Sequence, residues 1–133
     1  MIKSCIFDFG RVISAQKPMS LFRGYEEDLG LEPGMLNRIM YGSQIWQETM
    51  LGRKTLNEYW QEIGPMLGLH TDDEIATFRR RYASDEESNE DVLALIRRLR
   101  GRYKLAVLSN APPRGGKWLA GWDMLELVGV GVW

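Results

Sequence analysis

The chain has 133 residues, of which 17 are basic and 18 acidic. This near balance leaves no positive excess that would mark nucleic acid or an anionic membrane as a partner, and the length fits one compact core. A single histidine, His70, and a single cysteine, Cys5, exclude a zinc site with several Cys or His ligands and a disulfide framework, and they favour a reducing, cytoplasmic location.

The first predicted element is a short strand that ends near Asp8. Residues 2–7 form a mostly apolar run, and Gly10 follows the aspartate closely. β-Branched and aromatic residues that are bounded by a glycine favour a buried strand. We therefore expect the chain to begin with a strand inside a sheet.

The long middle of the chain, residues 18–100, is helical in pattern. Apolar residues recur there at spacings of three and four, which is the periodicity of an amphipathic helix. The sequences Thr-Leu-Asn-Glu at 55–58 and Thr-Asp-Asp-Glu at 71–74 are capping boxes, and each predicts a helix start. Gly30 and Gly101 predict helix ends. We expect several helices between two strands.

Two further strands are predicted after the helices. Residues 103–108 form an apolar run that ends in Ser109 and Asn110, and the tail 127–133 is rich in valine. A short helical stretch opens at Pro112 between them. Strands that are joined by long helical crossovers argue for a parallel sheet with helices on its faces.

Two polar clusters follow the first two predicted strands. One is Asp8 with Phe9 and Gly10, and the other is Ser109 with Asn110. Open α/β sheets bind their ligands at the carboxyl ends of strands, and the backbone N–H groups of strand-to-helix turns bind anions, phosphate above all. If the strands are neighbours, a carboxylate and a hydroxyl share one crevice. The alternative is that Asp8 and Ser109 only cap the turns that follow them.

Three segments resemble those of a known superfamily. The sequence Ile-Phe-Asp-Phe-Gly-Arg-Val-Ile at 6–13 resembles the first motif of the haloacid dehalogenase-like (HAD-like) hydrolases, and Leu-Ala-Val-Leu-Ser-Asn-Ala at 105–111 resembles the second. The segment 52–60 is similar to the cap of the phosphatase branch that carries a helical cap. A gap of about 100 residues between the motifs suits a cap that is inserted after the first strand.

The resemblance implies an α/β chain, a partial Rossmann-like parallel sheet of about three strands with an inserted helical cap. Residues 1–15 and 85–133 are expected to form the core, and residues 16–84 the cap. The tail 125–133 is similar to the family's third strand, so we expect the chain to stop before the rest of the site, as a fragment, a frameshifted product or a degenerate homologue. Such a sheet leaves one face and an edge underprotected, which predicts self-association through the exposed core edge.

The resemblance also implies a hydrolase that acts on a small phosphorylated metabolite through an aspartyl-phosphate. In that reaction Asp8 is the nucleophile, and Mg²⁺ is bound by Asp8 and the backbone carbonyl of Gly10. Ser109 hydrogen-bonds the phosphoryl oxygens, and the turn amides around Phe9, Gly10 and Asn110 complete the phosphate site. The partner is then a small phosphorylated substrate.

Two departures from the family pattern leave other functions open. Gly10 stands where many members carry a second aspartate that acts as general acid and base. Lys117 lies too close to Ser109 to be assigned as the lysine of the third motif. One alternative is a 2-haloacid dehalogenase, in which Asp8 attacks carbon and no metal is required. The other is an inactive remnant that binds a phosphorylated ligand or a protein partner.

Overall fold

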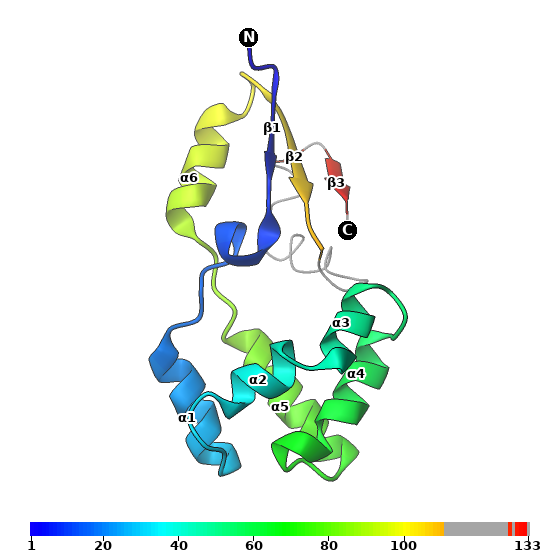
Figure 1. Cartoon of the computed structure of the whole chain (residues 1–133). Coiled ribbons are helices and arrows are strands. Elements are labelled where there is room, and N and C mark those ends of the chain that lie inside the picture. The colour runs from blue at the N-terminus through cyan, green and yellow to red at the C-terminus, as the bar shows by residue number, and fades with distance from the viewer. Residues whose placement is uncertain (111–127, 129, 133) are drawn as a thin grey trace. The chain divides into compact units, whose positions relative to one another are not determined.

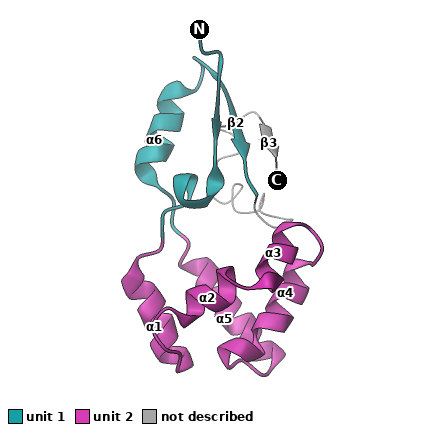
Figure 2. Cartoon of the chain, viewed as in Figure 1, with its two compact units in different colours: residues 1–16, 87–133 teal, residues 17–86 magenta. Residues whose placement is uncertain are grey.

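The chain forms two compact units (Figure 2). The computed structural model describes residues 1–110, 128 and 130–132. The first unit, which we call the sheet unit, combines residues 1–16 with 87–133, and the second, the helical unit, comprises residues 17–86. The sequence predicts the two boundaries between core and cap after residues 15 and 84. The helical stretch that is expected after Pro112 lies outside the described residues.

In the sheet unit, the described residues form three parallel strands in the order β1-β2-β3 (Figure 1). Their bounds are Ser4–Phe7 for β1, Lys104–Leu108 for β2 and Val130–Val132 for β3. The pairing of β1 with β2 puts Phe7 opposite Val107. The parallel sheet of about three strands that the sequence predicts is thereby confirmed.

One face of this sheet packs against helix α6, Glu90–Leu99, and against the turn that follows β1. Asn89 begins α6 by accepting a hydrogen bond from the Val92 N–H group at 3.4 Å, and Gly101 follows its end at a φ of 81°. Among the residues that the structure describes, the buried core of the unit is small: Phe9, Ile13, Leu93, Ile96, Leu105, Val107 and Val128. Each of its elements therefore depends on a few apolar contacts.

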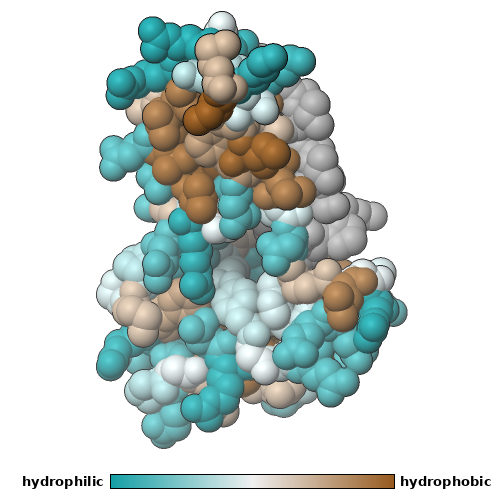
Figure 3. All heavy atoms as spheres, turned by 45° about the horizontal axis from the view of Figure 1, so that its top comes forward, coloured by the Kyte–Doolittle hydropathy of each residue, from teal (hydrophilic) through white to brown (hydrophobic). Residues whose placement is uncertain are grey.

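The other face of the sheet is partly open to solvent. Ile6 is 66% exposed and Leu108 is 55% exposed, and side-chain alternation along the strands places both on the face opposite Val107. Figure 3 shows apolar side chains gathered on the surface of the sheet unit. The expectation of a buried first strand is therefore wrong for this face, because among the described residues α6 and the turn after β1 cover the opposite face only. Self-association through this surface stays a prediction.

The helical unit follows the predicted starts and ends closely. Its elements are α1 (Met19–Leu29), α2 (Met35–Tyr41), α3 (Gln44–Met50), α4 (Leu56–Ile63), the short helical turn η2 (Pro65–Leu67) and α5 (Asp72–Ser84). Both capping boxes form, at Thr55 before α4 and at Thr71 before α5. Gly30 ends α1 in the left-handed conformation, which glycine adopts without strain. Within the described part of the chain, no helix has the length and apolar character that a membrane crossing requires.

An aromatic core holds the helical unit together. Its rings pack edge to face, as between Tyr25 and Phe78 at a centroid distance of 5.6 Å and between Tyr59 and Trp60 at 5.4 Å. The polar ends of the buried tyrosines are satisfied, because Tyr59 donates to a backbone carbonyl and Tyr25 donates to Asp85. Burial and the hydrogen bond to Asp85 raise the pKa of Tyr25, which keeps it neutral.

Paired contacts mark the two places where the chain passes between the units. Within the sheet unit, Ser14 pairs with Ser88 in an antiparallel bridge. Within the helical unit, Lys17 forms a salt bridge with Glu86 at 2.7 Å, and only 7% of the Lys17 side chain is exposed. The two connecting segments therefore run side by side in each unit, as an insertion between β1 and β2 requires.

The capping box of α5 makes stability depend on pH. The Glu74 carboxylate accepts hydrogen bonds from the His70 and Thr71 N–H groups at 2.8 and 2.9 Å, and these bonds lower its pKa below its usual 4.5. Since the folded pKa is the lower one, this contribution to stability is present above pH 4.5 and is lost as the pH falls through the folded pKa.

We therefore expect Glu74→Gln to reduce the loss of stability below pH 4.5. Urea unfolding at a series of pH values between neutral and acid measures this dependence. The matched control is Glu27→Gln, because Glu27 is exposed on α1 outside any capping box. The explanation fails if both variants follow the wild-type pH dependence.

Candidate functional site

Asp8 follows β1 directly and begins a tight turn. Its backbone remains extended, with φ −74° and ψ 153°, and its carboxylate Oδ1 accepts a hydrogen bond from the Phe9 N–H group at 2.7 Å. The residue is exposed, and its second carboxylate oxygen bonds to no other residue in the described ranges. Asp8 thus caps the turn, as the simpler interpretation expects, and still offers an oxygen to a ligand.

The turn η1, Phe9–Ile13, holds the backbone after Asp8 in place. The Ser14 N–H group donates to the Phe9 carbonyl at 2.9 Å, which closes the turn, while the Phe9 and Ile13 side chains are buried in the core of the sheet unit. Gly10 between them is exposed, and a Cβ added there would meet no atom of the described residues within 4 Å. The turn is therefore anchored by the buried Phe9 and Ile13 side chains, and no described residue packs against Gly10.

Ser14 is a residue of this turn that sequence reasoning missed. Its side chain is buried, and its hydroxyl accepts a hydrogen bond from the Arg11 N–H group at 3.1 Å. A serine after an apolar pair carries no signal for such a role, because the same residue type occurs in most loops. Only the folded turn shows that Ser14 fixes the backbone three residues after Asp8.

Ser109 and Asn110 follow β2. Because β2 pairs with β1 in parallel, Asp8 and Ser109 leave neighbouring strands at the same edge of the sheet, and neighbouring strands are about 4.8 Å apart. Ser109 is buried and Asn110 is exposed. The structure brings both predicted clusters to one edge, whereas their roles stay predictions.

The donor atoms at this edge fit a magnesium ion. The Asp8 carboxylate and the Gly10 backbone carbonyl offer only oxygen, and Mg²⁺ is commonly held by one or two carboxylates together with waters and substrate phosphate. Within the residues that the structure describes, no three His, Cys, Asp or Glu side chains gather into a complete protein cage. A small oxygen donor set of this kind suits Mg²⁺ better than zinc.

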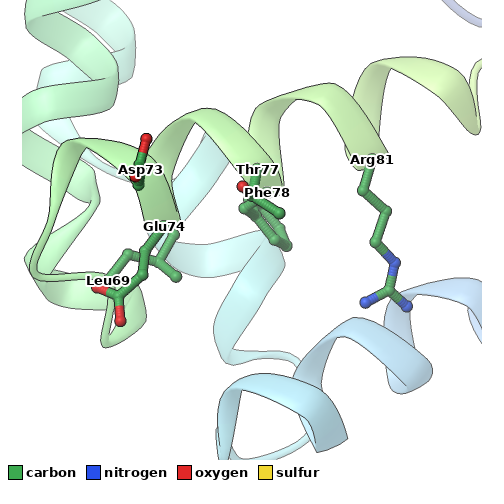
Figure 4. A pocket seen from close by; sticks show the side chains of 6 residues that line it. All are labelled: Leu69, Asp73, Glu74, Thr77, Phe78 and Arg81. Atoms are coloured by element: carbon green, nitrogen blue, oxygen red, sulfur yellow. The ribbon is translucent and has the colours of Figure 1, made fainter.

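A shallow pocket of about 360 Å³ lies elsewhere, in the helical unit (Figure 4). Its lining is Leu69, Asp73, Glu74, Thr77, Phe78 and Arg81. Figure 4 shows Arg81 extending from α5 toward the neighbouring helix, where it forms a salt bridge with Asp28 of α1 at 2.6 Å. Glu74 is held in the capping box. The pocket contains none of the predicted site residues. Its Arg81 and Glu74 side chains are already engaged in the salt bridge and the capping box, so they do not form a catalytic pair.

Comparison with known proteins gives matches among solved structures only. No family model and no curated protein matches the sequence. A HAD-family enzyme from Bacteroides thetaiotaomicron superposes with a TM-score of 0.66 at 19% sequence identity, over 98% of this chain and 67% of that one. A second structure of the Bacteroides enzyme, a magnesium complex, gives a TM-score of 0.62 at 19% identity, over 98% of this chain and 66% of that one.

Two proteins from other organisms also superpose on this chain. A predicted HAD-like family hydrolase from Porphyromonas gingivalis has a TM-score of 0.64 at 19% identity, over 98% of this chain and 65% of that one. A HAD phosphatase from Thermococcus onnurineus has a TM-score of 0.52 at 18% identity, over 98% and 61%. This chain therefore has the HAD-like hydrolase fold, as its motifs predict, and it spans about two thirds of the length of these proteins.

Proposed function

We propose that the chain is a HAD-like hydrolase of the phosphatase type, which acts on a small phosphorylated metabolite through an aspartyl-phosphate on Asp8. The main support is the parallel pairing of β1 with β2, because it brings a carboxylate and a hydroxyl to the ligand-binding edge of an α/β sheet. The fold likeness to HAD-family enzymes supports the same reaction class. In this proposal the helical unit is the cap that selects the organic part of the substrate.

The proposed reaction has two displacement steps at phosphorus. An oxygen of the Asp8 carboxylate attacks the phosphorus, the bond to the ester oxygen breaks, and the leaving alcohol takes up a proton from solvent. Water then attacks the aspartyl-phosphate, which releases inorganic phosphate and restores the carboxylate. Ser109 and the N–H groups of Gly10 and Asn110 stabilise the phosphoryl oxygens during both steps.

Phe9 has a different task in this scheme. Its N–H group already donates to Asp8 Oδ1, so it orients the nucleophile, while its buried ring anchors the turn. When bound by Asp8 and the Gly10 carbonyl, Mg²⁺ supplies positive charge that reduces the repulsion between a carboxylate and an anionic ester. In the proposal the Phe9 N–H group therefore positions Asp8, and the assignment of Phe9 to the phosphate site stays a prediction.

The decisive experiment compares two substrates with the whole purified chain. We expect hydrolysis of p-nitrophenyl phosphate that EDTA abolishes and Mg²⁺ restores, and no halide release from 2-chloropropionate. Metal-independent halide release would instead establish a dehalogenase, the alternative in which Asp8 attacks carbon. Binding of inorganic phosphate without turnover of either substrate would identify a non-catalytic phosphate-binding remnant and reject the enzyme.

A further inference from the structure

Arg11 adopts a backbone conformation that disfavours most side chains. Its φ is 61° and its ψ is 11°, which lies in the left-handed region, and within the described ranges it is the sole non-glycine residue with positive φ. Glycine, and to a lesser degree asparagine, occupies this region with little steric cost. An arginine here destabilises the folded chain by about fivefold in the folding equilibrium constant relative to glycine.

The surroundings of Arg11 hold it in this conformation. Its N–H group donates to Ser14 Oγ at 3.1 Å, and the turn on both sides is anchored by the buried Phe9 and Ile13. The guanidinium itself contributes nothing comparable, because it is exposed and makes no salt bridge or hydrogen bond with the residues that the structure describes. The side chain therefore stabilises no part of the described fold that would offset its backbone strain.

The position of Arg11 relative to other cations is unusual. It lies on the same turn as Asp8, three residues further on, at the carboxyl edge of the sheet. The other basic residues in the described part of the sheet unit lie at the amino ends of the strands or at the end of α6: Lys3, Arg97, Arg98, Arg100, Arg102 and Lys104. Among these residues, Arg11 alone can bring positive charge to the edge that carries Asp8 and Ser109.

We propose that Arg11 is a phosphate-binding residue, whose guanidinium holds the anionic phosphoryl group against Asp8. The inference rests on the proposed function, because it concerns the same site and the same class of substrate. A carboxylate and a phosphate monoester repel each other, so a nearby cation favours their approach. A guanidinium suits this task because its planar N–H groups bind two phosphate oxygens at once and stay charged at every working pH.

The test measures inorganic phosphate binding by calorimetry for the whole chain and for Arg11→Asn, Arg11→Gly and Arg11→Lys. We expect the asparagine and glycine variants to bind phosphate at least about tenfold more weakly, and the lysine variant to retain part of the affinity. Arg97→Asn, at the opposite edge of the sheet, is the matched control and should bind phosphate like the wild type. Urea unfolding should show that Arg11→Gly is more stable than the wild type.

The outcomes separate this inference from the function on which it rests. A wild-type chain that neither binds phosphate nor hydrolyses p-nitrophenyl phosphate overturns both. Wild-type affinity in Arg11→Asn, together with binding or turnover by the wild type, overturns the role of Arg11 and leaves the phosphatase proposal standing. A glycine variant that is less stable than the wild type overturns the argument from backbone strain, since it would show that the arginine side chain supports the fold.

Discussion

Asp8→Asn is expected to abolish phosphate-ester hydrolysis, with kcat reduced at least about 1,000-fold, while the fold is unchanged. A carboxamide is a far weaker nucleophile than a carboxylate and forms no aspartyl-phosphate. The turn survives, because the amide oxygen of asparagine still accepts the hydrogen bond that Asp8 Oδ1 receives from the Phe9 N–H group at 2.7 Å. Steady-state kinetics with p-nitrophenyl phosphate and urea unfolding measure the two effects separately.

Asp8→Ala is the informative companion to that variant. Alanine removes both the nucleophile and the acceptor for the Phe9 N–H group, so it should lose activity and also about 0.5–2 kcal/mol of stability. Equal stability of the two variants would show that the hydrogen bond to Phe9 does not hold the turn. Undiminished turnover in Asp8→Asn would reject the covalent mechanism, because no other carboxylate follows a strand at this edge among the described residues.

The order and type of the described elements are predictable from the sequence because they depend on local chemistry. Thr71 and Glu74 satisfy backbone groups of the same short segment, so their spacing alone indicates where α5 begins. Gly30 likewise ends α1 because its conformation is a local requirement. The long helical connection between β1 and β2 favours their parallel pairing, because parallel strands need a long crossover whereas a tight hairpin joins antiparallel strands.

The details of the site depend on contacts that the sequence does not display. Arg11 holds a positive φ in the turn, which no feature of the sequence indicates. The Phe9 N–H group, one of the turn amides expected around the phosphate, donates to Asp8 Oδ1. Both details belong to a turn whose ends are anchored by the buried Phe9 and Ile13, and this tertiary packing is not visible in the sequence. Burial of β1 is unpredictable for a related reason, because an apolar run does not indicate how many faces are covered.

Ile13→Ala is expected to unfold the sheet unit while the helical unit keeps its structure. Ile13 is fully buried in the small core beneath the turn, and its carbonyl also accepts a hydrogen bond from the Asn89 N–H group at 2.8 Å. Removal of the side-chain atoms should cost about 2–5 kcal/mol, which is a large part of the stability of a unit whose described part has few buried residues. The helical unit has a separate core, so the loss should remain local.

Hydrogen exchange followed by mass spectrometry tests this localisation, because it reports protection segment by segment. In Ile13→Ala, peptides from residues 2–16 and 90–108 should exchange rapidly, whereas those from residues 17–86 should stay protected. Ile63→Ala provides the matched control, since Ile63 is equally buried in the core of the helical unit and the same atoms are removed. In Ile63→Ala, peptides from residues 17–86 should exchange rapidly, whereas those from residues 2–16 and 90–108 should stay protected. If either substitution releases both units together, the two cores form one cooperative structure, and the turn that carries Asp8 draws its stability from the helical unit as well.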